Sequence, residues 1–267
     1  MRRAALAFTV LAAALAGLAL LAPTAHAGNS CEDKPLEVQS IVKGMDLALR
    51  TSRALDDSGA QIAFIARAGQ DLSKYRLRYS HMALVWRDQE RGRWLVVHEL
   101  NDCGSATSGL FNEGLGNFFL DDMFLYEAQL VIPSPDVQAR LARVLSTSTP
   151  RRLHHNSYNM LSYAYSTRYQ NSNQWVLESY AAASAEPGQV ETRAEAQAWL
   201  KQAGFRPITV EIPAMTRLGA RMFRANVAFD DHPYQRRMAG QIDTVTVDSV
   251  VRFIKAQDKQ ARTITVR

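Results

Sequence analysis

The chain has 267 residues, and its 31 lysines and arginines exceed its 26 aspartates and glutamates by five. This length suits one large or two small domains. The positive charge is small and evenly spread, and it falls to about +3 if the two arginines next to the N-terminus are removed, so it does not indicate a nucleic-acid partner.

The N-terminus has the three zones of a secretory signal. Two arginines precede an apolar run, 4–21, and the small residues of Thr24-Ala25-His26-Ala27 then stand at positions −3 and −1 of a cleavage site. An uncleaved anchor is the alternative, because the run is nearly long enough to span a bilayer. Pro23 breaks the run, which favours cleavage. We expect residues 1–27 to be a signal peptide and residues 28–267 to work in the periplasm of a Gram-negative bacterium, without a membrane span.

Two cysteines remain after this cleavage, Cys31 and Cys103. An even pair in an oxidising compartment predicts one disulfide, which would tie the mature N-terminus to a later loop. A reactive thiol at Cys103 is the alternative interpretation, but a lone exposed thiol there would be oxidised. A lipid-modified Cys31 is disfavoured, because it does not follow directly on a Leu-x-Ala/Gly motif.

Apolar periodicity in the first half of the mature chain predicts one helix and then an antiparallel meander. The elements are a helix over 36–55, a strand over 61–67, a hairpin of strands 80–86 and 93–100, and a strand over 126–132. The helix begins after Pro35 and ends before Gly59, and a polar turn over 87–92 joins the strands of the hairpin.

The second half is predicted to be mostly helical. Ser134 and Pro135 start a helix to about residue 145, a capping-box-like start predicts helix 171–184, and a second capping box predicts helix 192–203. Strands over 206–212 and 241–247 and a helix over 248–256 follow. The polar stretch 156–173 is expected to line a cleft or form an ordered loop. This order indicates an α+β fold, an antiparallel sheet packed by helices.

Three polar residues interrupt these patterns and are the candidate catalytic residues. His81 begins an apolar strand, and His98 lies near the end of the hairpin's second strand, so the two are cross-strand neighbours if they share a face. Ser172 lies at a predicted helix start, where free N–H groups stabilise an oxyanion. The alternatives are structural: a histidine at a strand start usually makes a hydrogen bond, and a serine beside a cap is a good N-terminal residue.

A strand with Ser80-His81-Met82-Ala83-Leu84-Val85, a hairpin to His98, and Asn171-Ser172-Asn173-Gln174-Trp175 opening a helix resemble the circularly permuted NlpC/P60 branch of the papain-like superfamily. The resemblance implies a base at His81, an orienting residue at His98 and a nucleophile at Ser172. It also implies that the polar neighbours Asn171, Asn173 and Gln174 contribute to binding. The superfamily has cysteine where this chain has Ser172, so the chain is either a serine variant or a binding scaffold that has lost catalysis.

The mature chain also resembles a secreted bacterial family known only as a domain of unknown function, DUF2145. The shared phrases are Ala68-Gly69-Gln70-Asp71-Leu72, Phe118-Phe119-Leu120-Asp121-Asp122 and Asn171-Ser172-Asn173-Gln174-Trp175. This second resemblance brings no activity with it. The two resemblances together predict one α+β domain, with a papain-like core over about 60–185 and an α/β extension over about 190–267.

These observations predict a periplasmic hydrolase or acyltransferase acting on an amide or ester bond. The expected partners, a cell-wall peptide or a lipid-linked acyl group, follow from compartment and superfamily. The alternative is an inactive peptide- or lipid-binding module on the same scaffold. No cofactor is implied. No metal is expected either, because His154-His155 and Asp230-Asp231-His232 have no recognised ligand spacing.

Overall fold

The computed structural model describes residues 35–88, 90–121 and 123–267. The predicted signal peptide and Cys31 lie outside the described residues, so the cleavage and the disulfide stay predictions. Within the described part of the chain, no helix combines the length and the apolar character needed to cross a membrane.

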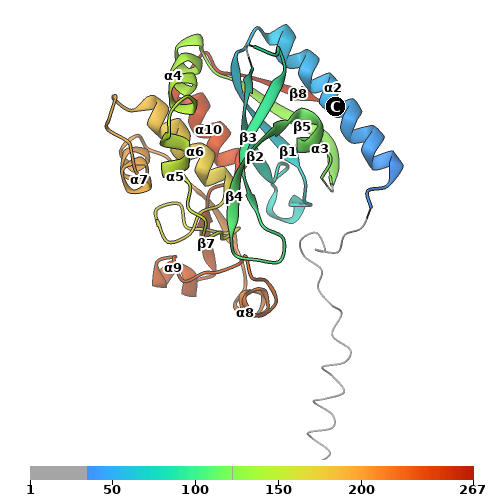
Figure 1. The fold of residues 1–267 in the computed structure, drawn as a ribbon. Coiled ribbons are helices and arrows are strands. Elements are labelled where there is room, and N and C mark those ends of the chain that lie inside the picture. Colours follow the sequence, from blue (N-terminus) through green and yellow to red (C-terminus); the bar gives the residue numbers. More distant parts are fainter. Residues whose placement is uncertain (1–34, 89, 122) are drawn as a thin grey trace, which may run out of the picture. The chain divides into compact units, whose positions relative to one another are not determined.

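The main sheet has six strands in the order β4-β3-β2-β1-β5-β8, and every neighbouring pair is antiparallel (Figure 1). The strands are β1 (Ile62–Ala68), β2 (His81–Arg87), β3 (Trp94–Asn101), β4 (Ser108–Gly114), β5 (Leu125–Ile132) and β8 (Arg262–Val266). The predicted α+β class, with an antiparallel sheet packed by helices, is confirmed. Because β8 comes from the end of the chain and pairs with β5, the segment after residue 190 completes this sheet.

Helices cover both faces of the main sheet. α2 (Val38–Ser58) and α3 (Leu115–Phe119) lie on one face, and α4 (Pro135–Leu145), α5 (Thr149–Leu153), α6 (Ser172–Ser184), α7 (Arg193–Gln202) and α10 (Val247–Gln257) contribute to the core on the other. Strand β1 shows the consequence, since all its residues are buried. Its Ala63 and Ile65 belong to the first core, whereas Phe64 and Ala66 belong to the second. A strand buried on both faces reads as a continuous apolar run, as 61–67 does.

A smaller unit follows α7. Strands β6 (Ile208–Glu211) and β7 (Gln241–Thr244) form a two-stranded sheet, and α8 (Ala214–Phe223) and α9 (Tyr234–Met238) lie between them in the chain. Its own core includes Val210, Phe229 and Ile242.

Each predicted helix and strand exists within a few residues of its predicted ends. The helix over 36–55 ends where Gly59 takes a left-handed φ of 70°, a conformation that costs glycine little. The capping box at the start of α7 is present. At α6 only half of the expected box forms: the Asn171 side chain accepts from Gln174 N–H, but the Gln174 side chain turns to Ser162 instead.

The strands β4 and β8, the helix α8 and the five-residue helices α3, α5 and α9 are not predicted from the sequence. β4 contains two glycines and no clear alternation, so its strand conformation depends on its partner β3, with which it pairs over its whole length. Strand formation at such a segment is decided by long-range pairing rather than by local propensity.

Candidate active site

The site begins where β2 and β3 separate. Their regular pairing starts only at Leu84 and Val97, so the first residues of β2 lack a strand neighbour on that side. Asn173, in the first turn of α6, fills the gap: its Oδ1 accepts from Met82 N–H at 2.9 Å and its Nδ2 donates to the Ser80 carbonyl at 3.3 Å. The amide thereby substitutes for strand pairing and fixes the start of α6 against the start of β2.

Ser172 is the first residue of α6 and meets His81 at this junction. Its Oγ lies 3.0 Å from His81 Nδ1, and His81 Nε2 lies 2.9 Å from His98 Nδ1. The expectation that the two histidines are neighbours therefore holds. All three residues that sequence reasoning selected are in contact.

Glu113, on β4, is the member that sequence reasoning missed. Its Oε1 lies 3.0 Å from His98 Nε2, which extends the contacts to Ser172–His81–His98–Glu113. We call these four residues the hydrogen-bond chain. No signal in the segment Leu110-Phe111-Asn112-Glu113-Gly114 marks Glu113 as a site residue except its charge. Only the pairing of β3 with β4 brings Glu113 beside His98.

The acceptor character of a carboxylate sets the direction of the protons. Ionised Glu113 can only accept, so His98 Nε2 carries a proton, and in a neutral imidazole His98 Nδ1 then accepts. His81 Nε2 must therefore donate, which leaves His81 Nδ1 as the acceptor for the Ser172 hydroxyl. With both histidines neutral, each hydrogen bond is satisfied, and the Ser172 proton points at a free imidazole lone pair.

Burial keeps both histidines in this neutral form. It lowers the pKa of His81 well below 6.5, and the positive charge of Arg67 lowers it further. Burial also lowers the pKa of His98, against the opposing effect of its hydrogen bond with Glu113.

The side chains around the two imidazole rings hold them in place. Arg67 donates to the Phe118 carbonyl and to Asp121. The Phe118 ring packs against both histidines, with centroid distances of 5.9 Å to His81 and 5.4 Å to His98. Rings fixed in this way keep the orientation that proton transfer needs.

Further donors surround the Ser172 hydroxyl. The Tyr158 hydroxyl lies near Ser172, and burial raises the Tyr158 pKa, so this hydroxyl stays protonated. The first-turn N–H groups of a helix have no intrahelical acceptor, and the Asn171 cap serves that of Gln174. The N–H groups of Ser172 and Asn173 are thus available at the positive end of the helix dipole.

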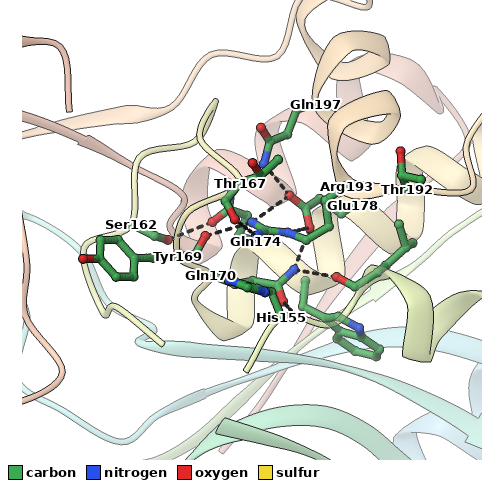
Figure 2. Close-up of polar contacts among 12 residues, drawn as sticks. His155, Ser162, Thr167, Tyr169, Gln170, Gln174, Glu178, Thr192, Arg193 and Gln197 are labelled. Atoms are coloured by element: carbon green, nitrogen blue, oxygen red, sulfur yellow. Dashed lines mark hydrogen bonds and ion pairs between the residues drawn. The ribbon is translucent and has the colours of Figure 1, made fainter. Parts of the chain in front are cut away.

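A buried polar network holds the segment that leads to Ser172 (Figure 2). Glu178 is fully buried and accepts from Gln170 Nε2 at 2.6 Å, Arg193 Nε at 2.9 Å and Gln197 Nε2 at 2.9 Å. Arg193 also donates to the carbonyls of Thr167 and Tyr169, each at 2.9 Å. Within the predicted polar stretch 156–173, the residues before α6 therefore form an ordered loop that is hydrogen-bonded to α6 and α7.

A second buried carboxyl lies close to Tyr158. Glu99 is fully buried, accepts from Ser108 Oγ at 2.8 Å, and has its other oxygen unpartnered among the described residues. Burial raises the Glu99 pKa to about 8, so the group is largely protonated at neutral pH. Ser108 Oγ is also 3.2 Å from His154 Nε2. This His154 contact, like that of His232 with Asp231 at 2.9 Å, is a hydrogen bond within the protein.

The three residues predicted to bind a ligand are buried and their amides make contacts within the protein. Asn171 caps α6 and also donates to Thr244 Oγ1 at 3.2 Å, while Gln174 Oε1 accepts from Ser162 Oγ at 2.8 Å. Asn173 joins α6 to β2, as described above. These side chains assemble the site, and a role in contacting a ligand stays a prediction. Among the described residues, no group of three or more His, Cys, Asp or Glu is arranged to hold a metal ion.

Comparison with known proteins identifies the family. Residues 54–254 match the model of a family described as "Uncharacterized protein conserved in bacteria (DUF2145)". The chain belongs to the DUF2145 family. No curated protein and no solved structure matches the chain. The match spans all four members of the hydrogen-bond chain and the buried network behind them.

Proposed function

We propose that this DUF2145 protein is a serine hydrolase or acyltransferase that cleaves an amide or ester bond through an acyl-enzyme on Ser172. One observation carries the proposal: the unbroken hydrogen-bond chain from Ser172 Oγ to Glu113, with successive contacts of 3.0, 2.9 and 3.0 Å. A nucleophile, a base and an orienting partner in such contact are the arrangement that nucleophilic catalysis needs.

The chemistry has two steps. Ser172 Oγ attacks the carbonyl carbon while its proton moves to His81 Nδ1, and the tetrahedral intermediate then expels the amine or alcohol, which takes that proton from His81. Water or an acceptor alcohol or amine next attacks the acyl-enzyme, gives its proton to His81, and releases Ser172 with its proton restored. Neither step requires a cofactor.

Charge develops at two points, and groups of this site face each of them. The positive charge that forms on the His81 imidazolium is stabilised by the carboxylate of Glu113, and neutral His98 lies between the two groups. The oxyanion forms near the Ser172 and Asn173 N–H groups and the Tyr158 hydroxyl. Donors fixed before the reaction stabilise such charge without the cost of reorganising.

The arrangement of elements also supports the permuted papain-like architecture that the motifs resemble. The nucleophile is the first residue of a helix, the base starts a strand packed on it, and the orienting histidine lies on the next strand. In that superfamily the nucleophile is a cysteine, and here the serine hydroxyl has a much higher pKa than a thiol. The hydrogen-bond chain that ends at Glu113 and the protonated Tyr158 hydroxyl nearby are what this site offers in compensation.

The substrate class follows from the proposed compartment. With a signal peptide removed after Ala27, the protein would act in the periplasm, where cell-wall peptides and lipid-linked acyl groups carry the amide and ester bonds that such a site cleaves. Both remain part of the proposal.

A fluorophosphonate probe on the purified protein tests the catalytic role directly. We expect labelling of the wild-type chain, no labelling of Ser172→Ala, and labelling of His81→Gln slowed by roughly 10²–10⁴-fold. Ser134→Ala is the matched control, because Ser134 also stands at a helix start but makes no capping hydrogen bond with its side chain. Labelling that persists in Ser172→Ala would refute the assignment of the nucleophile.

The depth of Ser172 favours a second candidate, a binding module without catalysis. The residue is only 4% exposed, and His81 beside it is only partly exposed, so little of the hydrogen-bond chain faces solvent at this end. If no ester, thioester or peptide is turned over and the probe leaves Ser172 unlabelled in a folded protein, the site is better described as the floor of a binding surface.

A further inference from the structure

Helix α8 presents its apolar side away from the protein. Met215, Leu218 and Met222 are spaced three and four residues apart, so they share one side of the helix, and Phe223 extends it. Their exposed fractions are 78%, 54%, 67% and 80%, respectively. Large side chains this exposed on one element are unusual for a soluble surface.

The opposite side of α8 is the one that meets the protein, and it carries a charge. Arg217 is buried and donates to the Ile212 carbonyl at 2.5 Å, and Ala220 packs against the small core beside it. Burial of an arginine is unfavourable unless it is paired, whereas burial of methionine or phenylalanine is favourable. The apolar side of α8 therefore faces away from the protein, while the side that faces the protein carries a charge. This orientation is expected if another apolar phase buries the exposed side.

Helix α9 carries two more exposed apolar residues, Tyr234 at 68% and Met238 at 54%, and both helices lie at the lower end of the coloured ribbon in Figure 1. We call the six exposed residues of the two helices, Met215, Leu218, Met222, Phe223, Tyr234 and Met238, the apolar ridge. Its side chains are flexible or aromatic, and exposed side chains of these kinds can insert into a fluid lipid surface.

Cationic groups border the apolar ridge. Arg221 lies exposed on α8, Arg224 ends that helix, and Arg237 lies over the Tyr234 ring at 5.7 Å. Among the residues that the structure describes, none of these three arginines forms an ion pair with a carboxylate. The acidic residues of this segment are engaged elsewhere: Asp230 pairs with Arg168 at 2.8 Å and Asp231 with His232. The border therefore has uncompensated positive charge.

We infer that the apolar ridge is a membrane-docking surface that inserts at the headgroup level of an anionic lipid bilayer. Amphipathic helices with Phe, Leu and Met on one side and arginines beside them bind in this way, through buried apolar area and attraction to anionic lipid. The inference does not depend on the proposed catalytic function, because it concerns binding alone.

The ridge is attached to the loop that precedes Ser172. Met160 N–H donates to the Asn226 carbonyl at 2.9 Å, and Asn226 Nδ2 donates to Asn101 Oδ1, at the end of β3, at 2.8 Å. These bonds join the segment after α8 to the strand that carries His98. A bilayer bound at the ridge is thus linked to the candidate site through two short hydrogen-bonded segments.

Vesicle co-sedimentation of the purified protein tests the inference. We expect partitioning onto vesicles of phosphatidylglycerol and phosphatidylcholine, weaker partitioning onto phosphatidylcholine alone, and weakening with added salt. Phe223→Asp should lower the partition coefficient at least about tenfold, since it replaces an aromatic side chain that the bilayer would bury with a charged one. Phe124→Asp is the matched control, because Phe124 is 51% exposed and lies outside the ridge. It should bind like the wild type.

The charge contribution has its own comparison. Arg221→Glu should weaken binding to anionic vesicles and leave binding to phosphatidylcholine vesicles unchanged. Arg91→Glu, a charge reversal at an exposed turn, should leave binding to both kinds of vesicle unchanged. If thermal melting shows that Phe223→Asp is unfolded, Met215→Asp repeats the test at an equally exposed position.

Three results would overturn the inference. The wild type does not sediment with anionic vesicles, or Phe124→Asp loses as much binding as Phe223→Asp, or light scattering shows a dimer that Phe223→Asp converts to a monomer. The last result would identify a second copy of the chain as the occupant of the ridge.

Discussion

Glu113→Gln is the most informative single change, because it removes one charge at the far end of the hydrogen-bond chain and leaves the shape of the side chain. The side chain is 22% exposed, so the substitution should have little effect on folding. The amide can donate where the carboxylate only accepted. His98 Nε2 is then free to become an acceptor, and the tautomers of both histidines can reverse. In the reversed state His81 Nδ1 carries a proton and cannot accept one from Ser172.

The size of the charge effect follows from the geometry. Hydrogen bonds of 2.9 and 3.0 Å on either side of the His98 ring separate the carboxylate from His81. With the width of an imidazole added, the separation is about 8 Å, and two unit charges at that distance interact by about 2 kcal/mol at an effective dielectric constant of about 20. Loss of that stabilisation from the imidazolium-forming transition state slows acylation about thirtyfold. Reversal of the tautomers increases the loss toward roughly 10³-fold.

Single-turnover acylation by a p-nitrophenyl ester measures this rate, with Glu211→Gln, on an exposed strand, as the control for loss of one surface carboxylate. A double-mutant cycle shows whether Glu113 acts through His98. In a His98→Ala background, Glu113→Gln should have almost no further effect, because the residue that transmits its influence is gone.

A role for Glu113 in acylation is refuted if Glu113→Gln acylates within about twofold of the wild type while Ser172→Ala is inactive. The functional contacts would then end at His98. A role that acts through His98 is refuted if Glu113→Gln slows acylation equally in both backgrounds, since the carboxylate would then act by a route that does not pass through the imidazole.

Three further outcomes are expected. Ser172→Cys should retain or raise activity toward activated esters, because a thiol in contact with a neutral histidine is the stronger nucleophile, and loss of all ester turnover would contradict this. Glu99→Gln should flatten the pH dependence of stability. Because the Glu99 pKa is raised in the folded state, the folded protein keeps a proton there that the unfolded chain has lost above pH 4.5. The free energy of unfolding of the wild type, measured by urea titration, should therefore fall by roughly 2–4 kcal/mol more than that of the variant between pH 5 and 8. Arg193→Met leaves the buried Glu178 carboxylate without its ion-pair partner, so it should lower the free energy of unfolding by about 3–5 kcal/mol in the same titrations. A decrease below about 1 kcal/mol would show that the network is not needed for folding.

The local features of this protein could be predicted from its sequence. The apolar run of β1, the hairpin that brings His81 near His98, and the cap that starts α6 at Ser172 each depend on residues close together in the chain. Periodicity, turn composition and capping are short-range properties, so these elements and the three candidate catalytic residues were accessible without the structure.

Tertiary structure decided what those residues can do. Glu113 became the end of the hydrogen-bond chain only because β4 pairs with β3, although its own sequence is a poor strand. The gap between β2 and β3, filled by the Asn173 amide, and the exposed side of α8 likewise depend on which distant segments meet. Such pairings are set by packing of the whole chain, and the free energy that selects them is not present in any local window of the sequence.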